Sequence, residues 1–160
     1  GRLMKIGLMW VSAGIMLAFP MFSANAQQAT TSGDLVIERA WTRTTDADNR
    51  SAAIYFTLRN VGQATVDLIG MRADRASIEE LHKTEFDTTG TARMSAAPEL
   101  RVAPGETFKL EPGGMHVMLI DVESPLVEGE TLPLRLKFYD GDDIIVDVPI
   151  LAADARGPQE

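Results

Sequence analysis

The segment LPLRLKFYDGDDIIVDVPI, residues 132–150, decides the fold class because apolar and polar residues alternate along both of its halves. A period of two places one set of side chains on each face of a β-strand. The two halves therefore predict strands at 131–139 and 143–150, each with one buried face. Asp140-Gly141 lies between them, and this dipeptide is typical of a two-residue β-hairpin turn.

Other short segments rich in β-branched and aromatic residues have the same character and are separated by turn signals such as Pro104-Gly105. They predict strands at 35–41, 52–59, 65–72, 78–84, 91–95, 107–110 and 115–122. No segment after residue 26 shows helical periodicity over three turns. Many short strands joined by regular turns predict an all-β domain, either a sandwich or a barrel.

Residues 1–26 have the three parts of a cleavable secretory signal peptide. Arg2 and Lys5 lie near the start, an uncharged apolar run follows at 6–22, and Ala24-Asn25-Ala26 fits a cleavage site. The alternative is a membrane anchor, but the run is at the short end of the roughly 20 residues that span a bilayer, and it contains a proline. We therefore expect an exported protein whose only membrane contact is through the signal peptide before cleavage.

The mature chain is expected to consist of a flexible linker at 27–33, a β-domain at 34–151 and a disordered tail at 152–160. Loss of Arg2 and Lys5 lowers the number of Lys and Arg from 15 to 13 against 23 Asp and Glu, so its net charge is −10. This charge disfavours binding to nucleic acid or anionic lipid and favours a protein partner with a basic docking patch. The chain has no cysteine, which excludes disulfides and thiolate metal sites. We expect a monomer.

The stretch PGGMHVML, residues 112–119, contains one of only two histidines in the chain. Both histidines and two of the four methionines outside the signal peptide form one pattern, which consists of His82, Met94, His116 and Met118. Imidazole nitrogen and thioether sulfur together make a soft, neutral site that suits Cu(I) better than Mg, Ca or Mn, while zinc prefers Cys, His and carboxylate. A blue-copper electron-transfer site would need a cysteine ligand, so it is excluded.

Strand alternation places His116 and Met118 on one face and Met115, Val117 and Leu119 on the other, which is expected to be the core face. Leu81 is expected to point inward and His82 outward. Taken alone, His116 would more simply be an incidental surface residue. The acidic pair Glu79-Glu80 could orient the His82 ring, although a solvated acidic edge is the simpler interpretation. Trp41 is expected to be a core aromatic residue and Arg43 a surface or edge-strand charge.

With these residues in place, the sequence resembles the periplasmic copper A chaperone family, which is cupredoxin-like. The similarity covers about residues 35–150 and includes AWTR at 40–43, AAIYFTLRN at 52–60, LH at 81–82, PGGMHVML at 112–119 and LPLRLKF at 132–138. The resemblance implies a cupredoxin-like Greek-key β-sandwich and one Cu(I) per chain bound by His82, Met94, His116 and Met118. It also implies a bacterial periplasmic protein that delivers copper to the copper A centre of cytochrome c oxidase, or to a thiol-bearing copper-assembly protein.

The sequence departs from the family pattern at Lys83, where many members carry a second methionine, and in its tail, which has no His or Met. An accessory copper site is therefore not expected. The predicted ligands are expected at one exposed outer edge of the sandwich, where copper could leave by ligand exchange. We do not expect an enzyme. One alternative is a copper-dependent redox enzyme, for which no acid, base or substrate pocket is recognisable. The other is a metal-free β-sandwich binding module, which would leave the His and Met pattern unexplained.

Overall fold

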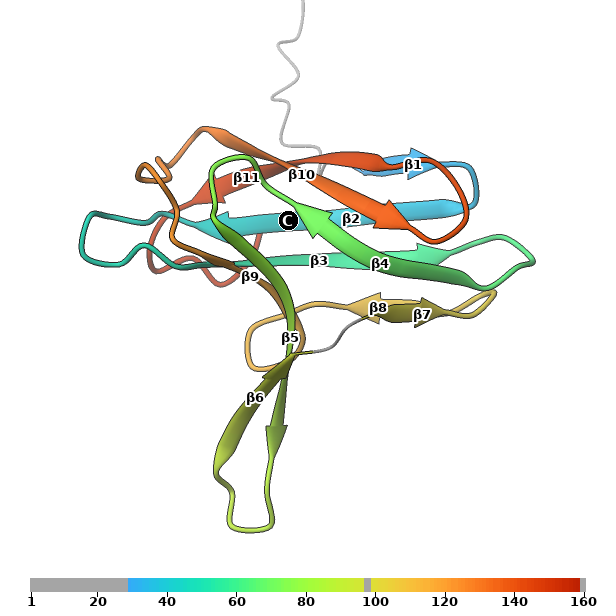
Figure 1. Cartoon of the computed structure of the whole chain (residues 1–160), viewed down its shortest axis with the longest axis horizontal. Coiled ribbons are helices and arrows are strands. Elements are labelled where there is room, and N and C mark those ends of the chain that lie inside the picture. Colours follow the sequence, from blue (N-terminus) through green and yellow to red (C-terminus); the bar gives the residue numbers. More distant parts are fainter. Residues whose placement is uncertain (1–28, 97–98, 159–160) are drawn as a thin grey trace, which may run out of the picture.

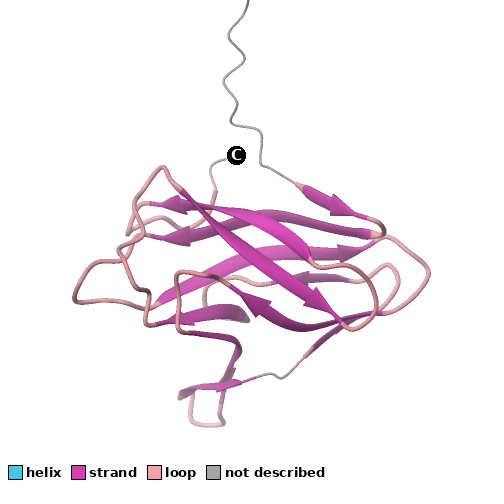
Figure 2. Ribbon diagram, turned by 45° about the horizontal axis from the view of Figure 1, so that its top comes forward, coloured by secondary structure: helices cyan, strands magenta, loops and turns pink. Residues whose placement is uncertain are grey.

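The computed structural model describes residues 29–96 and 99–158, and within these ranges the side chains of all residues except 78, 83–85 and 92–96. The predicted signal peptide lies outside the described residues. The described chain is all β-strand and turn, without a helix (Figure 2). The strands are β1 (Thr30–Ser32), β2 (Leu35–Arg43), β3 (Ala52–Asn60), β4 (Val66–Arg72), β5 (Ile78–Phe86), β6 (Ala92–Ala96), β7 (Leu100–Val102), β8 (Thr107–Lys109), β9 (His116–Ile120), β10 (Thr131–Phe138) and β11 (Ile144–Leu151). This architecture confirms the predicted all-β fold class.

The strands form one continuous sheet that curls over on itself, so that two layers enclose the core (Figures 1 and 2). Strands pair in the order β6-β5-β9-β3-β2-β11-β10-β4-β7, with β1 beside β2 and β8 beside β3. The layers join where β11 pairs parallel with β2 and antiparallel with β10. Ile54 and Leu58 of β3 and Leu134 and Leu136 of β10 all have 0% exposure, which places the core between the two layers.

The hairpin predicted from residues 132–150 is confirmed, with Leu136 paired to Ile144 as its last pair. Side chains along β10 alternate strictly between exposed and buried, as the sequence predicts. The prediction of a two-residue turn at Asp140-Gly141 is wrong, because five residues, 139–143, separate the two strands. The end of β10 turns toward β4 instead: Phe138 pairs with Leu68, and the Tyr139 amide donates to the Asp67 carbonyl at 3.0 Å.

Two short strands were not predicted. β1 lies in the predicted linker 27–33, and the prediction of flexibility is wrong for this part because β1 pairs with β2. It is a nearly exposed, three-residue edge strand held by backbone pairing, so it lacks the alternation that identifies a strand in sequence. β7 is equally short, although Leu100 and Val102 are both buried.

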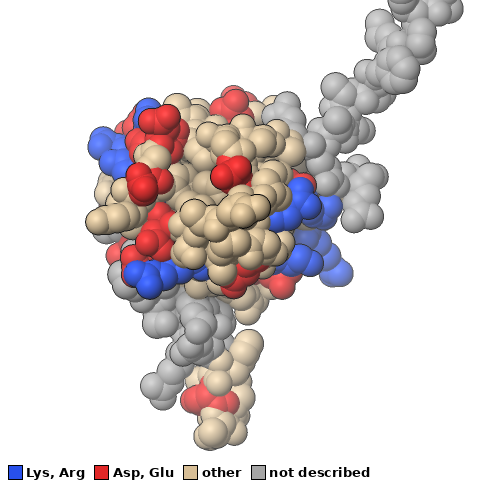
Figure 3. Space-filling model, turned by 90° about the vertical axis from the view of Figure 1, so that its right-hand side faces the viewer, with Lys and Arg blue, Asp and Glu red and all other residues tan. Residues whose placement is uncertain are grey.

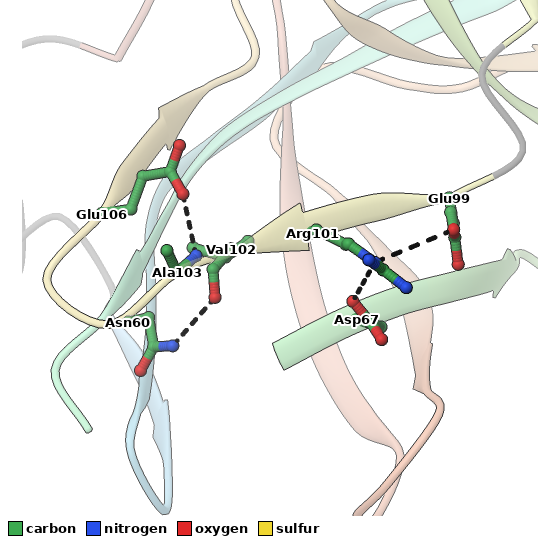
Figure 4. A network of polar contacts seen from close by, with 7 residues as sticks. All are labelled: Asn60, Asp67, Glu99, Arg101, Val102, Ala103 and Glu106. Atoms are coloured by element: carbon green, nitrogen blue, oxygen red, sulfur yellow. Dashed lines mark hydrogen bonds and ion pairs between the residues drawn. The ribbon is translucent and has the colours of Figure 1, made fainter. Parts of the chain in front are cut away.

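A buried asparagine connects the end of β3 to β7 by a side-chain hydrogen bond (Figure 4). Asn60, at the end of β3, has 0% exposure and donates through Nδ2 to the carbonyls of Val102 at 3.0 Å and Ala64 at 2.7 Å. Its Oδ1 accepts from the Gly62 amide at 2.9 Å. On the surface nearby, Arg101 Nε lies 3.2 Å from Asp67 Oδ1. All polar atoms of the buried amide group thus have partners, which a buried polar side chain requires.

A β-bulge in β2 determines which face Trp41 occupies. Glu38 pairs with Thr57 and Trp41 with Tyr55, so β2 contains one extra residue relative to β3. The bulge includes Arg39, whose φ of 58° is in the left-handed region. Strict alternation would place Trp41 in the core. The extra residue instead moves Trp41 to the outer face of the sheet, beside Tyr55. Trp41 is buried, as predicted, but outside the core cluster between the two layers.

Part of the predicted disordered tail is folded against the sheet. Within residues 152–158, the Ala155 carbonyl accepts a hydrogen bond from Arg43 Nε at 2.8 Å. The Ala155 amide donates to the Ala152 carbonyl at 3.1 Å, which closes a turn. The tail prediction is corrected for this part, because Arg43 supplies a donor that composition alone does not reveal. Residues 159–160 lie outside the described residues.

The β5–β6 hairpin projects from the body of the domain (Figures 1 and 3). β5 pairs with β9 through residues 78–82 and with β6 through residues 82–86. Its first half therefore belongs to the body of the sheet, and its second half leaves the body together with β6. His82 is the residue at which the two pairings meet.

Candidate metal centre

The two histidines of the chain are direct partners on neighbouring strands. His82 of β5 pairs with His116 of β9, and the neighbouring pairs are Leu81 with Val117 and Glu80 with Met118. Leu81 is 4% exposed and Val117 0%, so these two residues occupy the core face as predicted. By alternation, the two histidines, Glu80 and Met118 share the opposite face.

The His82 ring is oriented by a carboxylate. Its Nε2 lies 2.7 Å from Glu80 Oε2, and its side chain is 17% exposed. A carboxylate accepts, so Nε2 carries the proton and Nδ1 presents its lone pair. Nδ1 is buried and has no hydrogen-bond partner among the described residues. The interpretation of Glu79 and Glu80 as a solvated acidic edge is therefore wrong for Glu80. Glu79 accepts from the Ala73 amide at 3.1 Å instead.

The His116 ring is oriented by the backbone. Its Nδ1 lies 3.0 Å from the carbonyl oxygen of Gly114, which can only accept, so Nδ1 carries the proton. The lone pair is then on Nε2, which is buried and lacks a hydrogen-bond partner in the described part of the chain. The rings of His82 and His116 have centroids 5.7 Å apart and planes inclined by 76°. Each histidine thus presents one buried, unpaired nitrogen on the same small area of the sheet.

The structure places Met118 beside the histidines and leaves the Met94 side chain undescribed. Met118 is half-buried and lies between Glu80 on one side and Ala53 of β3 on the other. The backbone of Met94, in β6, pairs with Thr84, two positions from the pair formed by His82 and Ala96. Three of the four predicted ligands are therefore on paired strands in the body of the sheet, and the fourth is on the projecting hairpin, midway along its paired strands.

The burial of His116 differs from the expectation of an exposed site at the outer edge. The residue is only 5% exposed. β9 is an interior strand, so side chains of both β5 and β3 lie beside His116 on the outer face. One of them is Tyr55, whose ring centroid lies 6.4 Å from that of His116. His116 is thus the enclosed member of the site, and His82 and Met118 are the more accessible ones.

Unpaired buried nitrogens are uncommon in folded proteins, because desolvating a polar atom without a partner is costly. Two such atoms on adjacent strands are accounted for if both take the same ligand. The donors are neutral imidazoles with a thioether beside them, and this combination is the one that suits Cu(I). Among the described residues, no group of three or more His, Cys, Asp or Glu side chains is placed to hold a metal ion.

Sequence comparison matches the chain to one family model and to two curated proteins. The model of the LpqE-like family, described as "Putative lipoprotein LpqE-like", matches residues 35–150. "Putative lipoprotein Lxx21020" of Leifsonia xyli subsp. xyli is 30% identical over 128 residues, which cover 79% of this chain and 76% of that protein. The uncharacterized protein RP573 of Rickettsia prowazekii is 25% identical over 100 residues, which cover 62% of this chain and 55% of RP573.

Structural comparison finds the same architecture in solved PCuAC domains. The copper-bound PCuAC domain from PmoF2 matches with a TM-score of 0.66 at 20% identity, covering 78% of this chain and 98% of that domain. The solution structure of CuI-DR1885 from Deinococcus radiodurans matches with a TM-score of 0.60 at 29% identity, covering 82% of this chain and 85% of that one. No helix in the described part of this chain is long and apolar enough to cross a membrane. The sequence resemblance to copper A chaperones is confirmed: the chain belongs to the LpqE-like family and has the fold of PCuAC domains.

Proposed function

We propose that this protein is an exported metallochaperone that carries one Cu(I) ion, with His82, Met94, His116 and Met118 as its ligands. The observation that carries the proposal is the pair of buried nitrogens, His82 Nδ1 and His116 Nε2, on directly paired residues of β5 and β9. Neither has a hydrogen-bond partner among the side chains that the structure describes. Met118 shares their face of the sheet. We include Met94 among the ligands because of its spacing in the sequence and because its register in β6 places it two positions from the pair formed by His82 and Ala96.

The relatives support this proposal. DR1885, which is 29% identical to this chain, has a solved structure with Cu(I). The family model and the Leifsonia relative both carry the word lipoprotein in their names, which supports an exported protein of the cell envelope, here assigned to the periplasm. None of the relatives named above is described as an enzyme, and we assign no catalytic activity to this chain.

Copper transfer would proceed by ligand exchange. Cu(I) prefers thiolate over thioether, so transfer to an acceptor cysteine is downhill. With His116 enclosed, the acceptor would approach from the side of His82 and Met118 and displace a thioether first. Met94 belongs to the projecting hairpin, which begins at His82, so an outward movement of this hairpin would open the coordination shell without unfolding the core.

The proposed acceptor is the copper A subunit of cytochrome c oxidase or a thiol-bearing protein that assembles this centre. The net charge of −10 expected after signal-peptide removal favours an acceptor with a basic patch around its cysteines. Encounter between oppositely charged surfaces is accelerated at low ionic strength and screened by salt. Transfer to a matching acceptor should therefore slow as salt is added, while copper affinity should change little.

The deciding experiment is an anaerobic Cu(I) titration of the protein against a competing chelator, followed by X-ray absorption on the loaded protein. The expected result is one Cu(I) per chain with both nitrogen and sulfur scattering. Zn(II) should bind weakly in a parallel titration, because two of the four ligands are thioethers. A copper shell of oxygen and nitrogen alone would remove Met94 and Met118 from the site. Wild-type copper affinity in both His82→Ala and His116→Ala would overturn the proposal as a whole.

A further inference from the structure

The AWTR motif at residues 40–43 contributes no copper ligand, yet its tryptophan packs against Tyr55, whose ring lies beside that of His116. Trp41 is 4% exposed and Tyr55, its partner on β3, is 7% exposed. Neither residue belongs to the hydrophobic core cluster between the layers. Their ring centroids are 4.8 Å apart with planes inclined by 40°. The two aromatics therefore form a second, separate packing group on the outer face of the sheet.

The guanidinium group of Arg43 packs over both rings of this aromatic pair. Its Cζ lies 4.8 Å from the centroid of the Trp41 ring and 5.7 Å from that of Tyr55, within the range of cation–π attraction. Nε of Arg43 donates to the Ala155 carbonyl at 2.8 Å, and Nη1 lies 3.5 Å from the Tyr55 hydroxyl. The guanidinium group is thus held between the C-terminal segment and the two rings, so neither ring is free to turn outward.

Tyr55 continues this packing to the copper site. Its ring meets that of His116 edge-on, with centroids 6.4 Å apart and planes inclined by 60°. His116 therefore lies between Tyr55 on β3 and His82 on β5. The hydrogen bond to Gly114 selects the Nδ1–H tautomer only while the ring keeps this rotamer, and one bond does not by itself hold the ring there. A bulky neighbour on the β3 side supplies the second constraint.

We propose that Tyr55 is a positioning residue for His116: it holds the imidazole so that Nε2 faces the copper site, and Trp41 and Arg43 keep Tyr55 in place. This inference rests on the proposed function for its effect on copper, but the orientation of the ring can be measured without metal. It assigns a role to the AWTR motif and to the folded part of the tail. Removal of residues that hold a ligand in place commonly lowers metal affinity about 10- to 100-fold.

The central test compares Tyr55→Leu with Tyr55→Phe. Tyr55→Leu removes the ring and should lower Cu(I) affinity by roughly 10-fold. Tyr55→Phe keeps the ring and should restore nearly all of that affinity. In the metal-free protein, ¹⁵N spectra of the imidazoles should show His116 protonated at Nδ1 in wild type and Tyr55→Phe, and a mixture of tautomers in Tyr55→Leu. A purely structural role for Tyr55 would leave this tautomer signature unchanged.

Tyr139→Leu is the matched control, because Tyr139 is the other tyrosine of the chain and is 78% exposed. It should leave copper affinity and the His116 spectrum as in wild type. If Tyr55→Leu does not fold, Arg43→Met provides the second arm, since it keeps both rings and removes only the guanidinium group. That variant should shift the Trp41 fluorescence and lower copper affinity several-fold.

The outcomes separate the two proposals. Absence of Cu(I) binding by the wild-type protein would overturn the proposed function, while the metal-free spectra would still report on Tyr55. Wild-type copper affinity together with an unchanged His116 tautomer, in folded Tyr55→Leu or in Arg43→Met, would overturn the positioning role alone.

Discussion

Glu80 and His82 form a carboxylate–imidazole pair at 2.7 Å that leaves His82 with only Nδ1 available to a metal. His116 is held in the opposite sense, with Nδ1 bonded to a carbonyl and Nε2 available. Two histidines that face each other across paired strands thus offer different ring nitrogens. The two histidines are directly paired, so the difference does not come from their positions in the sheet. It comes from Glu80, which bonds Nε2 of His82, and from Gly114, which bonds Nδ1 of His116.

Replacing Glu80 tests this arrangement. Glu80→Gln keeps the size of the side chain but offers an amide that can donate as well as accept, so the His82 tautomer is no longer fixed. Cu(I) affinity should fall roughly 10-fold, and ¹⁵N spectra should show His82 in both tautomers. Glu128→Gln, at an exposed position far along the chain, should change neither quantity. Unchanged copper affinity in Glu80→Gln would show that this carboxylate does not orient the ligand.

The two methionines that flank His116 should respond differently to truncation. Met118 is on the face of the histidines, so Met118→Ala should weaken copper binding and leave the free energy of unfolding nearly unchanged. Met115 packs against the core cluster and is only partly buried. Met115→Ala should therefore destabilise the fold by about 2 kcal/mol, the low end for a core methionine, with little loss of affinity. Chelator competition and urea denaturation measure the two effects. A folded Met115→Ala variant without copper affinity would invert the assignment of faces.

The turn of the β5–β6 hairpin should be sensitive to acid. Asp87 Oδ1 accepts from the Thr89 hydroxyl at 2.6 Å and from the Thr89 and Thr91 amides, each at 2.9 Å. These bonds, with that from the Thr89 hydroxyl the largest cause, hold the pKa of Asp87 below its ordinary value of 3.8. A carboxyl group whose folded pKa is depressed stabilises the fold above its unfolded pKa and loses this contribution as pH falls through the folded pKa. The turn should therefore stay closed down to pH 3.8 and loosen below it.

Amide proton shifts of Thr89 and Thr91 in a pH titration measure this loosening. In wild type both should move together with a midpoint below 3.8, and in Asp87→Asn, which has no titrating carboxyl group, neither should move in this range. A wild-type midpoint at or above 3.8 would contradict the stabilising role of the charged carboxylate. Because the turn joins the strands of His82 and Met94, Asp87→Ala should also weaken copper binding.

Most of the fold could be predicted from sequence because its strands have one buried face, and alternation records that burial directly. All nine predicted strands are present. Two of the features that escaped prediction have no such record: β1 is held by backbone pairing alone, and the turn after β10 is set by contacts with β4. β7 does alternate, but over only three residues. The bulge at Arg39 is the most consequential of them. One extra residue in β2 moves every side chain after it to the opposite face of the sheet, and hydrophobic periodicity alone does not show where that residue is inserted.

The candidate site divides in the same way. Both histidines and Met118 could be placed on one face from their spacing and from strand alternation. These two properties are local and do not depend on distant parts of the chain. The burial of His116 could not, because it arises where Tyr55, far away in sequence, lies on the adjacent strand. The orientation of each imidazole also depends on pairing, through Glu80 in one case and Gly114 in the other. Register between strands is a tertiary property that residue types do not encode one at a time.

The bulge itself can be tested by two substitutions at Arg39. Its φ of 58° is strained for an L-residue and most strained for a β-branched one, whereas glycine adopts it freely. Arg39→Gly and Arg39→Val both remove the arginine side chain and its contacts, so the difference between them isolates the backbone. We expect Arg39→Val to be less stable than Arg39→Gly by about 1–2 kcal/mol in urea denaturation.

The same pair of variants should report on the aromatic group outside the sheet. Arg39→Gly keeps the bulge, so Trp41 should stay beside Tyr55 and retain the fluorescence maximum of a buried tryptophan. Arg39→Val favours a regular strand, which disturbs the position of Trp41 and should shift its emission toward that of a solvated indole. Copper affinity should follow the fluorescence, because the packing of Trp41 supports Tyr55 and, through it, His116. Equal stability and equal emission in the two variants would show that the left-handed residue is not what sets the register between β2 and β3.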